Sequence, residues 1–287
     1  YGLFLKVILA DNLAPFVDTG FAMSISDMSA LDVWTLSFLF GFQIYFDFSA
    51  YSHIALGSAK LMGINFPENF NFPYLATSPR DFWKKWHISL SSWIRDYLYL
   101  PLAGVKLGEN SSPGGGLEVA ITQEKKDKAL FSSWAIMGLW HGANWTFVVW
   151  GLYHAVCIYL YRTITSSKTL SGFNIPTFIS IALTLPVMML GWIPFRAESV
   201  SDTLKMWGRV FDPTAYSFLG MRENAYLVAG LILVGIFITK FSIVTISRFL
   251  QENSLLFRTL ETLAYCVLIP VVLIFLRPIN QFIYFQF

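Results

Sequence analysis

The sequence predicts an all-α fold, a polytopic bundle of transmembrane helices. Of the 287 residues, 55% are hydrophobic and only 13% are charged, which is too little charge to cover a soluble domain of this size. Apolar stretches about as long as a bilayer crossing recur along the chain and alternate with short polar links. No period of about 20 to 50 residues repeats, so a solenoid is not expected. We therefore expect a single transmembrane domain over residues 1–287, surrounded by membrane lipid.

The first predicted element, residues 3–16, is too short to span a bilayer alone. The chain begins at Tyr1 without an initiator Met, and no basic segment or cleavage site of a signal peptide is recognisable. We therefore expect the chain to be the C-terminal part of a longer protein. Later stretches reach the length of a span, which needs about 20 apolar residues: residues 31–56, 130–161, 175–193, 225–246 and 260–276.

The second of these stretches is too long for one straight span. About 32 helical residues would measure about 50 Å, against a hydrocarbon core of about 30 Å. We therefore predict a break near residues 138–144, giving two shorter helices or a re-entrant turn, because irregular backbone is tolerated in the membrane interior where protein or water surrounds it. The break contains His141, within a segment that has no charged residue from Ala129 to Tyr161. A titratable ring placed there is costly unless it has a partner or a function.

A different kind of segment lies between the first two spans. Residues 66–74 are rich in aromatic residues and proline and predict an extended loop at the lipid headgroups. Ser78 and Pro79 then predict a helix start, and the apolar positions that follow recur at helical spacing. We expect one amphipathic interfacial helix that ends at Pro101.

The polar segment 104–128 has the composition of a mobile loop, with glycine, serine and a run of charges. Elsewhere the basic residues are scattered, and the net charge of +2 gives no indication of a nucleic-acid partner. The chain has no GxSxG elbow, HExxH, P-loop or GxGxxG motif, so hydrolase, zinc protease, NTPase and dinucleotide-binding functions lack their minimum apparatus. The histidines are too dispersed to predict a metal site.

Several polar residues have both a structural and a functional interpretation. His87 falls on the apolar stripe of the interfacial helix and is either hydrogen-bonded to neighbouring backbone or functional. Asp47 lies one turn after Gln43, and the two are expected to hydrogen-bond if their role is structural. His154 is expected to be a packing histidine with satisfied hydrogen bonds, and His53 remains ambiguous. Gly138 and Gly142 form a GxxxG, which brings membrane helices close together whatever His141 does.

The sequence resembles the membrane-bound O-acyltransferase family, and within it the branch of the alginate O-acetyltransferase membrane subunit. The resemblance rests on ordered blocks at residues 47–52, 67–70, 80–91, 93–102, 138–145 and 282–287. It implies a helical core that lacks its N-terminal helices and has a tunnel through the membrane. It also implies that His141 is the essential histidine and His87 an auxiliary one. His53 departs from the branch, which usually has an acid there.

The resemblance implies transfer of an acetyl group from a cytoplasmic donor, with no cofactor bound to the protein. Acetyl-CoA or another acyl thioester is the expected donor, and hydroxyls of an exported or cell-wall polysaccharide are the expected acceptor. A periplasmic SGNH-hydrolase-like acetyltransferase is the expected partner, and the bacterial cytoplasmic (inner) membrane the expected location. A neutral imidazole suits a general base because its unperturbed pKa is about 6.5.

We assign the base to His141 as a hypothesis, with His87, Asn144 or Trp145 orienting the donor or stabilising the oxyanion. The basic residues of the interfacial helix either hold donor phosphates or anchor the protein at the lipid headgroups. The full set of expected supporting or donor-binding residues is Asp47, Trp140, Asn144, Trp145, Arg80, Lys84, Lys85, Ser91, Arg95 and Asp96.

Two other classes of function remain open from the sequence. In a proton-coupled transporter, Asp47, His87 and His141 would form a proton relay. In a non-catalytic scaffold, the chain would recruit an extracytoplasmic acetyltransferase. Only an enzyme predicts acyl transfer that depends on His141.

Overall fold

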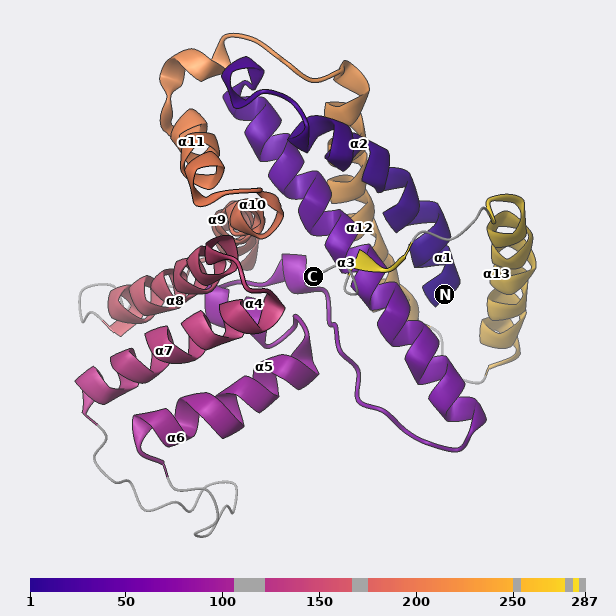
Figure 1. Ribbon diagram of the computed structural model, residues 1–287. Helices are drawn as coiled ribbons and strands as arrows, with labels where there is room; N and C mark the ends of the chain where they lie inside the picture. The colour runs from indigo at the N-terminus through magenta and orange to yellow at the C-terminus, as the bar shows by residue number, and fades with distance from the viewer. Residues whose placement is uncertain (106–121, 167–174, 250–253, 277–280, 284–287) are drawn as a thin grey trace. The chain divides into compact units, whose positions relative to one another are not determined.

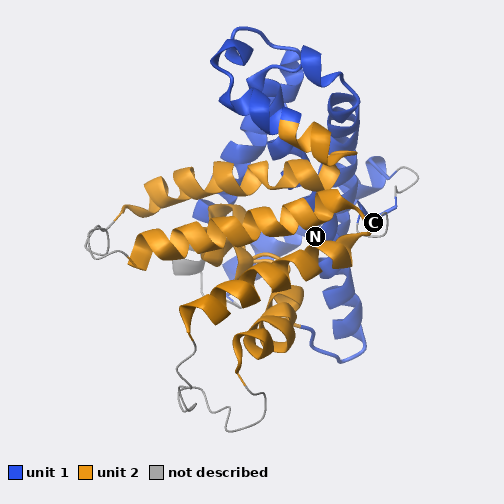
Figure 2. Ribbon diagram, turned by 60° about the vertical axis from the view of Figure 1, so that its left-hand side comes forward, with its two compact units in different colours: residues 1–66, 205–287 blue, residues 67–204 orange. Residues whose placement is uncertain are grey.

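The computed structural model describes residues 1–105, 122–166, 175–249, 254–276 and 281–283, most of which form helices (Figure 1). No strand occurs in these described ranges, so the all-α prediction is confirmed. The chain divides into two compact units (Figure 2). Unit 1 consists of residues 1–66 and 205–287, and unit 2 of residues 67–204.

Unit 1 is built from the two ends of the chain, and a π-helical segment, Leu5–Ala10, joins its first two helices. Its helices are α1 (Gly2–Phe4), α2 (Asp11–Phe21), α3 (Ala30–Leu61), α12 (Glu223–Phe249) and α13 (Leu255–Ile274). Unit 2 contains α4 (Pro79–Trp83), α5 (Ile88–Ile94), α6 (Leu100–Ala103), α7 (Gln123–His141), α8 (Trp145–Ser166), α9 (Thr177–Leu190) and α10 (Trp192–Arg196). The boundary between the units falls within α11 (Val200–Phe211).

Four helical segments in the described ranges are long and apolar enough to cross a membrane: Trp145–Ser166, Thr177–Arg196, Glu223–Ser242 and Leu255–Ile274. They overlap four of the predicted spans. Helix α3 covers the remaining prediction, 31–56, but does not join this group, because polar residues along it lower its hydropathy. The chain is therefore an integral membrane protein.

The start of α3 is fixed by a buried carboxylate within unit 1. Ser29 and Asp32 form a reciprocal capping box, in which Asp32 N donates to Ser29 Oγ and Ser29 N donates to Asp32 Oδ2. The same carboxylate accepts hydrogen bonds from Gly220 N at 2.9 Å, from Met221 N at 3.1 Å and from the Tyr226 hydroxyl. These contacts tie the segment that leads into α12 to the first turn of α3.

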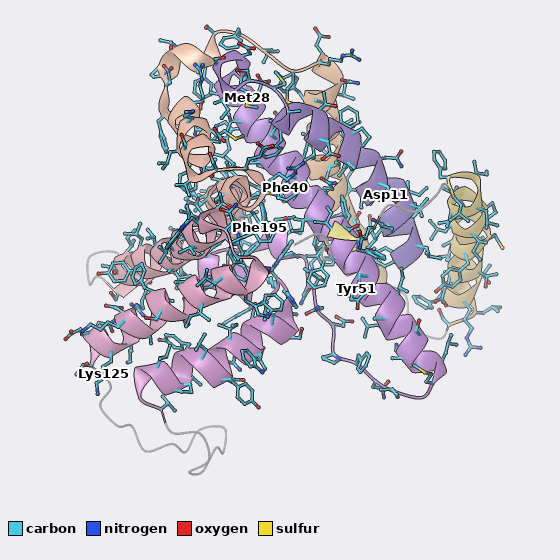
Figure 3. All side chains as sticks on the ribbon, viewed as in Figure 1. Asp11, Met28, Phe40, Tyr51, Lys125 and Phe195 are labelled. Atoms are coloured by element: carbon cyan, nitrogen blue, oxygen red, sulfur yellow. The ribbon has the colours of Figure 1, made fainter. Side chains whose placement is uncertain are left out.

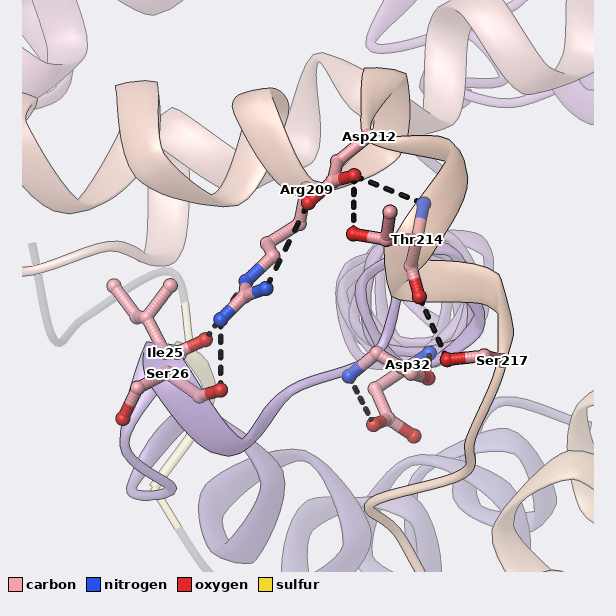
Figure 4. Close-up of polar contacts among 8 residues, drawn as sticks. Ile25, Ser26, Asp32, Arg209, Asp212, Thr214 and Ser217 are labelled. Atoms are coloured by element: carbon pink, nitrogen blue, oxygen red, sulfur yellow. Dashed lines mark hydrogen bonds and ion pairs between the residues drawn. The ribbon is translucent and has the colours of Figure 1, made fainter.

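Polar contacts also fasten the connection that follows α11 (Figure 4). Arg209 donates to the carbonyl oxygen of Ile25 at 3.3 Å and to that of Ser26 at 2.7 Å. Asp212 caps the next turn by accepting from the backbone N–H and the hydroxyl of Thr214, at 2.9 and 2.6 Å. Backbone groups that would otherwise lose their partners are thus satisfied by side chains.

A second buried carboxylate, Asp47, lies in the middle of α3 and is bound within unit 1. Asp47 Oδ1 lies 2.7 Å from Lys6 Nζ, which also pairs with Asp11 at 2.9 Å. Asp47 Oδ2 accepts from Ile283 N at 2.8 Å. The expected hydrogen bond between Asp47 and Gln43 does not form, because the ammonium group and the backbone N–H occupy the carboxylate.

The predicted interfacial helix begins where expected but is not continuous. Ser78 caps α4, accepting from Asp81 N at 3.1 Å. The helix breaks before α5 because His87 adopts a left-handed conformation with φ 42°. Pro101 does not end the helix, because it occupies the first turn of α6, where its missing N–H is tolerated. Gly104, at φ 96°, ends it instead.

The predicted polar loop, residues 104–128, lies mostly outside the described residues, but its last part is helical. Residues 106–121 lie outside the described residues, and Gln123 begins α7 with Thr122 as its N-cap. The charged run 124–128 therefore forms the first turns of a helix. The reason is that glutamate and lysine are good helix formers once a cap is present.

Candidate functional site

The break between α7 and α8 places His141 at a helix end in unit 2. Helix α7 ends at His141 and α8 begins at Trp145, so the predicted break is confirmed. Asn144 has a structural role in the break, because its Oδ1 accepts from Thr146 N at 3.1 Å and satisfies a donor in the first turn of α8. His141 is only partly buried there.

Glycines bring α7 and α8 into close antiparallel contact (Figure 1). A Cβ built on Gly138 would lie 2.2 Å from the carbonyl oxygen of Phe147, and one on Gly151 would lie 2.1 Å from that of Trp134. At Gly142, a Cβ would lie 2.4 Å from the ring of Phe147. The close approach predicted from GxxxG is therefore confirmed, and it holds the turn that carries His141.

Aromatic rings from three helices surround the His141 imidazole. Its centroid lies 4.9 Å from Trp150 of α8 and 5.1 Å from Phe195 of α10, both in edge-to-face geometry. Phe195, labelled in Figure 3, also contacts Phe147 at 5.1 Å. Trp140 lies 4.9 Å from His141 but is half exposed. These contacts fix the orientation of the imidazole by packing, in largely apolar surroundings.

His87 is buried in the connection between α4 and α5. It occupies the N-cap position of α5 and not a helical face, so the prediction that it lies on the apolar stripe of a continuous helix is wrong. Its Nδ1 lies 3.2 Å from Asn69 Oδ1 and 3.4 Å from Ser89 Oγ. Burial lowers the pKa of His87 to about 3, and the nearby His141 acts in the same direction. His87 is therefore neutral at neutral pH.

The two histidines share one aromatic cluster within unit 2. Trp192 lies 6.4 Å from Trp150, which contacts His141, and 4.8 Å from Trp86, which precedes His87 in the chain. Trp150 and Trp192 are almost fully buried. The sequence placed His87 and His141 in separate segments, and the structure brings both to the edges of this cluster.

His154 lies deeper in the same cluster and is fully buried. Its ring contacts Trp83 at 4.9 Å, Trp150 at 5.1 Å and Trp134 at 5.7 Å. Within the described ranges, neither ring nitrogen has a hydrogen-bond partner. The prediction of a packing histidine is confirmed, but the expected hydrogen bonds are not formed.

Some of the expected donor-binding residues already have ion-pair partners, and others do not. Lys85 pairs with Asp81 at 2.7 Å, and Arg95 pairs with Asp96 at 2.7 Å. Arg80 and Lys84 are exposed, and neither has an ion pair within the described ranges. These two cations are therefore the ones available to an anionic ligand or to lipid headgroups.

The remaining predicted site residues have structural contacts or are exposed. Ser91 Oγ donates to Trp86 O at 2.9 Å, which supports the turn around His87. Trp145 is three-quarters exposed at the start of α8. Asp47 lies in unit 1, with the partners given above. Sequence patterns missed Phe195 and Trp192, because nothing in their spacing relates them to residues about 50 positions earlier.

The site combines neutral imidazoles with apolar walls. In the described ranges, no group of three histidine, cysteine, aspartate or glutamate side chains could hold a metal ion. A neutral imidazole at the edge of an apolar cluster can accept a proton from a hydroxyl, and water-poor surroundings strengthen electrostatic interactions with a reacting group.

The residues that form this site lie within 1–195, the part of the chain that matches a known family. Residues 1–195 match the family model of the membrane-bound O-acyltransferases (MBOAT). The whole chain is 33% identical to the peptidoglycan O-acetyltransferase of Helicobacter pylori and covers 55% of that protein. Over 73% of its length, the chain is 36% identical to the probable alginate O-acetylase of Azotobacter vinelandii and covers 38% of it.

A more distant similarity involves the teichoic acid D-alanyltransferase of Bacillus subtilis. That protein is 30% identical over 57% of this chain, which covers 41% of the relative. The chain thus spans about half, or less, of the length of the relatives that it matches.

Proposed function

Because the chain belongs to the membrane-bound O-acyltransferase family, we propose that it forms the catalytic core of a membrane-embedded O-acyltransferase with His141 as general base. The observation that carries this proposal is the position of His141. Its imidazole lies at the break between the closely packed helices α7 and α8, where the rings of Trp150 and Phe195 contact it.

The proposed reaction needs only the acceptor hydroxyl, the neutral imidazole of His141 and the acyl thioester. The acceptor hydroxyl gives its proton to His141 while its oxygen attacks the thioester carbonyl carbon. A C–O bond forms and the C–S bond breaks. The proton on His141 then passes to the leaving thiolate, which restores the neutral ring. General base catalysis of this kind typically contributes about 10² to 10⁴-fold to the rate.

Acetyl-CoA, or another acyl thioester on the cytoplasmic side, is the donor in this proposal. Arg80 and Lys84 suit its phosphates because they are exposed, whereas Lys85 and Arg95 already have carboxylate partners. Lysine and arginine are common phosphate ligands at membrane surfaces. The donor binds only transiently, since it is consumed in each turnover.

Hydroxyls of an exported or cell-wall polysaccharide are the acceptor in this proposal. Relatives named for O-acetylation of peptidoglycan and alginate support this class of acceptor. A periplasmic SGNH-hydrolase-like acetyltransferase would complete transfer to the polymer, and the bacterial cytoplasmic membrane would be the site of action.

The test uses the full-length protein in proteoliposomes with its periplasmic partner. Radiolabel from acetyl-CoA should appear on a polysaccharide or on a hydroxyl of the partner. His141→Ala should abolish the label while the protein remains folded in the membrane. Proton uptake without label transfer would instead identify a transporter, and label transfer by the partner alone would identify a scaffold.

A further inference from the structure

The backbone at His87 is held in a strained conformation. His87 has φ 42° and ψ 56°, in the left-handed region that residues with a Cβ rarely adopt. Such strain persists only where surrounding contacts over-determine the conformation, and it is concentrated at functional sites. The contacts that hold His87 should therefore include those that set its chemistry.

Backbone hydrogen bonds fasten both sides of His87 to the loop that precedes α4. Ile88 N donates to Asn69 O at 3.0 Å, and Asn71 N donates to Lys85 O at 3.0 Å. The segment 69–71 therefore runs along the connection that carries His87. This places the Asn69 side chain beside the imidazole.

The contacts of Asn69 identify its two amide atoms. Ser89 N donates to Asn69 Oδ1 at 3.1 Å, and Ser89 Oγ donates to the same atom at 3.0 Å. Because a backbone N–H can only donate, the Asn69 atom that faces it must be the amide oxygen and not the amide nitrogen. The orientation of the Asn69 amide is therefore fixed by its partners.

The same oxygen faces His87 Nδ1 at 3.2 Å. An amide oxygen only accepts, so the nitrogen opposite it must carry a proton. Ser89 Oγ, 3.4 Å from Nδ1, gives its own proton to Asn69 and adds a second acceptor. The neutral ring therefore carries its proton on Nδ1 and its lone pair on Nε2.

We infer that Asn69 and Ser89 are positioning residues that fix the Nδ1–H tautomer of His87, so that Nε2 accepts a hydrogen bond from the acyl acceptor. The role of Nε2 toward substrate rests on the proposed function. A nitrogen with only a lone pair cannot donate, so His87 does not stabilise the oxyanion through Nε2. It suits an acceptor with several hydroxyls, in which one hydroxyl reacts and a neighbouring hydroxyl donates to His87.

Nitrogen NMR of histidine-labelled full-length protein in lipid tests the tautomer directly. The signals of His87, assigned by their loss in His87→Gln, should show a protonated Nδ1 and an unprotonated Nε2. In Asn69→Leu, which lacks the acceptor, the proton should redistribute toward Nε2. A protonated Nε2 in the wild-type protein would overturn the inference.

The pH dependence of acyl transfer tests the consequence for the reaction. Asn69→Asp keeps an acceptor for the same donors and adds a negative charge beside Nδ1–H. The carboxylate stabilises the imidazolium and raises the pKa of His87, so Nε2 loses its lone pair at a higher pH. The acid limb of the rate profile should therefore move upward.

Asn71→Asp is the matched control, because Asn71 is exposed on the same loop and donates its backbone N–H to Lys85 O. Its acid limb should stay at the wild-type position. His141 is the titratable group whose charge acts on His87, while Asp81 and Lys85 nearby pair with each other at 2.7 Å. An unmoved acid limb in Asn69→Asp would contradict the inference. Absence of transfer in the wild type would instead count against the proposed function, and the NMR result would still decide the tautomer.

Discussion

His141 and His87 have different surroundings, and the surroundings give the two rings different chemistry. Trp150 and Phe195 contact His141 through their rings, so packing orients this imidazole. Asn69 and Ser89 contact His87 through hydrogen bonds, so its proton position is also set. In the proposed function, His87 would hold the acceptor and His141 would remove its proton.

His154 differs from both, because its nitrogens have no hydrogen-bond partner within the described ranges. Burying such groups unpaired costs about 1 to 3 kcal/mol. His154→Phe should therefore leave the unfolding temperature unchanged or raise it, and acyl transfer should continue. Thermal unfolding in detergent and the label-transfer assay check this prediction. A lower unfolding temperature together with lost transfer would indicate a polar partner of His154, such as a buried water molecule.

Sequence patterns identified a single residue where a titratable side chain lies in an apolar segment, because burying such a side chain is costly. His141 stood out as a titratable ring in a segment without charges. The role of Asn69 was hidden, because it depends on a loop that folds back onto Ser89, about 20 residues later. The contacts of Asp47 with Lys6 and Ile283 were also hidden, because these partners come from the two ends of the chain and leave no local signal.

At the scale of elements, the α7–α8 hairpin determines where His141 lies. Gly138 and Gly151 allow α7 and α8 to approach until their backbones are in contact. The length of the apolar stretch 130–161 predicted the break, since one straight helix of that length would exceed the thickness of the bilayer. It could not predict that the interfacial helix also breaks at His87, because the left-handed conformation there depends on tertiary contacts with segment 69–71.

Gly151→Ala should destabilise the hairpin. The added Cβ would lie 2.1 Å from the Trp134 carbonyl oxygen, and separating the helices should cost about 1 to 3 kcal/mol. Gly235→Ala in α12 is the matched control, because no atom lies within 4 Å of its Cβ. The control should be neutral or stabilising by about 0.5 to 1 kcal/mol. The unfolding temperatures of the two variants, measured in the same detergent, check this difference. Equal values would contradict close packing at Gly151.

Replacing a basic residue next to α4 should weaken donor binding if that residue holds the donor phosphates. Lys84→Glu should raise the KM for the acyl donor several-fold with little change in membrane insertion, because Lys84 is exposed and has no ion pair within the described ranges. Lys125→Glu, at an exposed lysine of α7 that Figure 3 labels, should leave the KM unchanged. An unchanged KM in Lys84→Glu, or reduced insertion alone, would favour the role as a headgroup anchor.

At the scale of the whole molecule, the candidate site lies within one unit, residues 67–204, and within the part that matches the family. The all-helical class followed from composition and from the length of apolar stretches, which a bilayer constrains strongly. The division into two units did not follow from the sequence. Unit 1 joins residues 1–66 to residues 205–287, and pairing between distant segments has no local pattern.

The most direct test of the account compares His141→Ala with Leu139→Ala in single-turnover acyl transfer. Both variants replace one residue in the last turn of α7 with alanine, and Leu139 is exposed. At equal amounts of folded protein, His141→Ala should lose about 10² to 10⁴-fold in rate or more, and Leu139→Ala should stay near the wild-type rate. Transfer by His141→Ala at the wild-type rate would contradict the assignment of His141 as the general base.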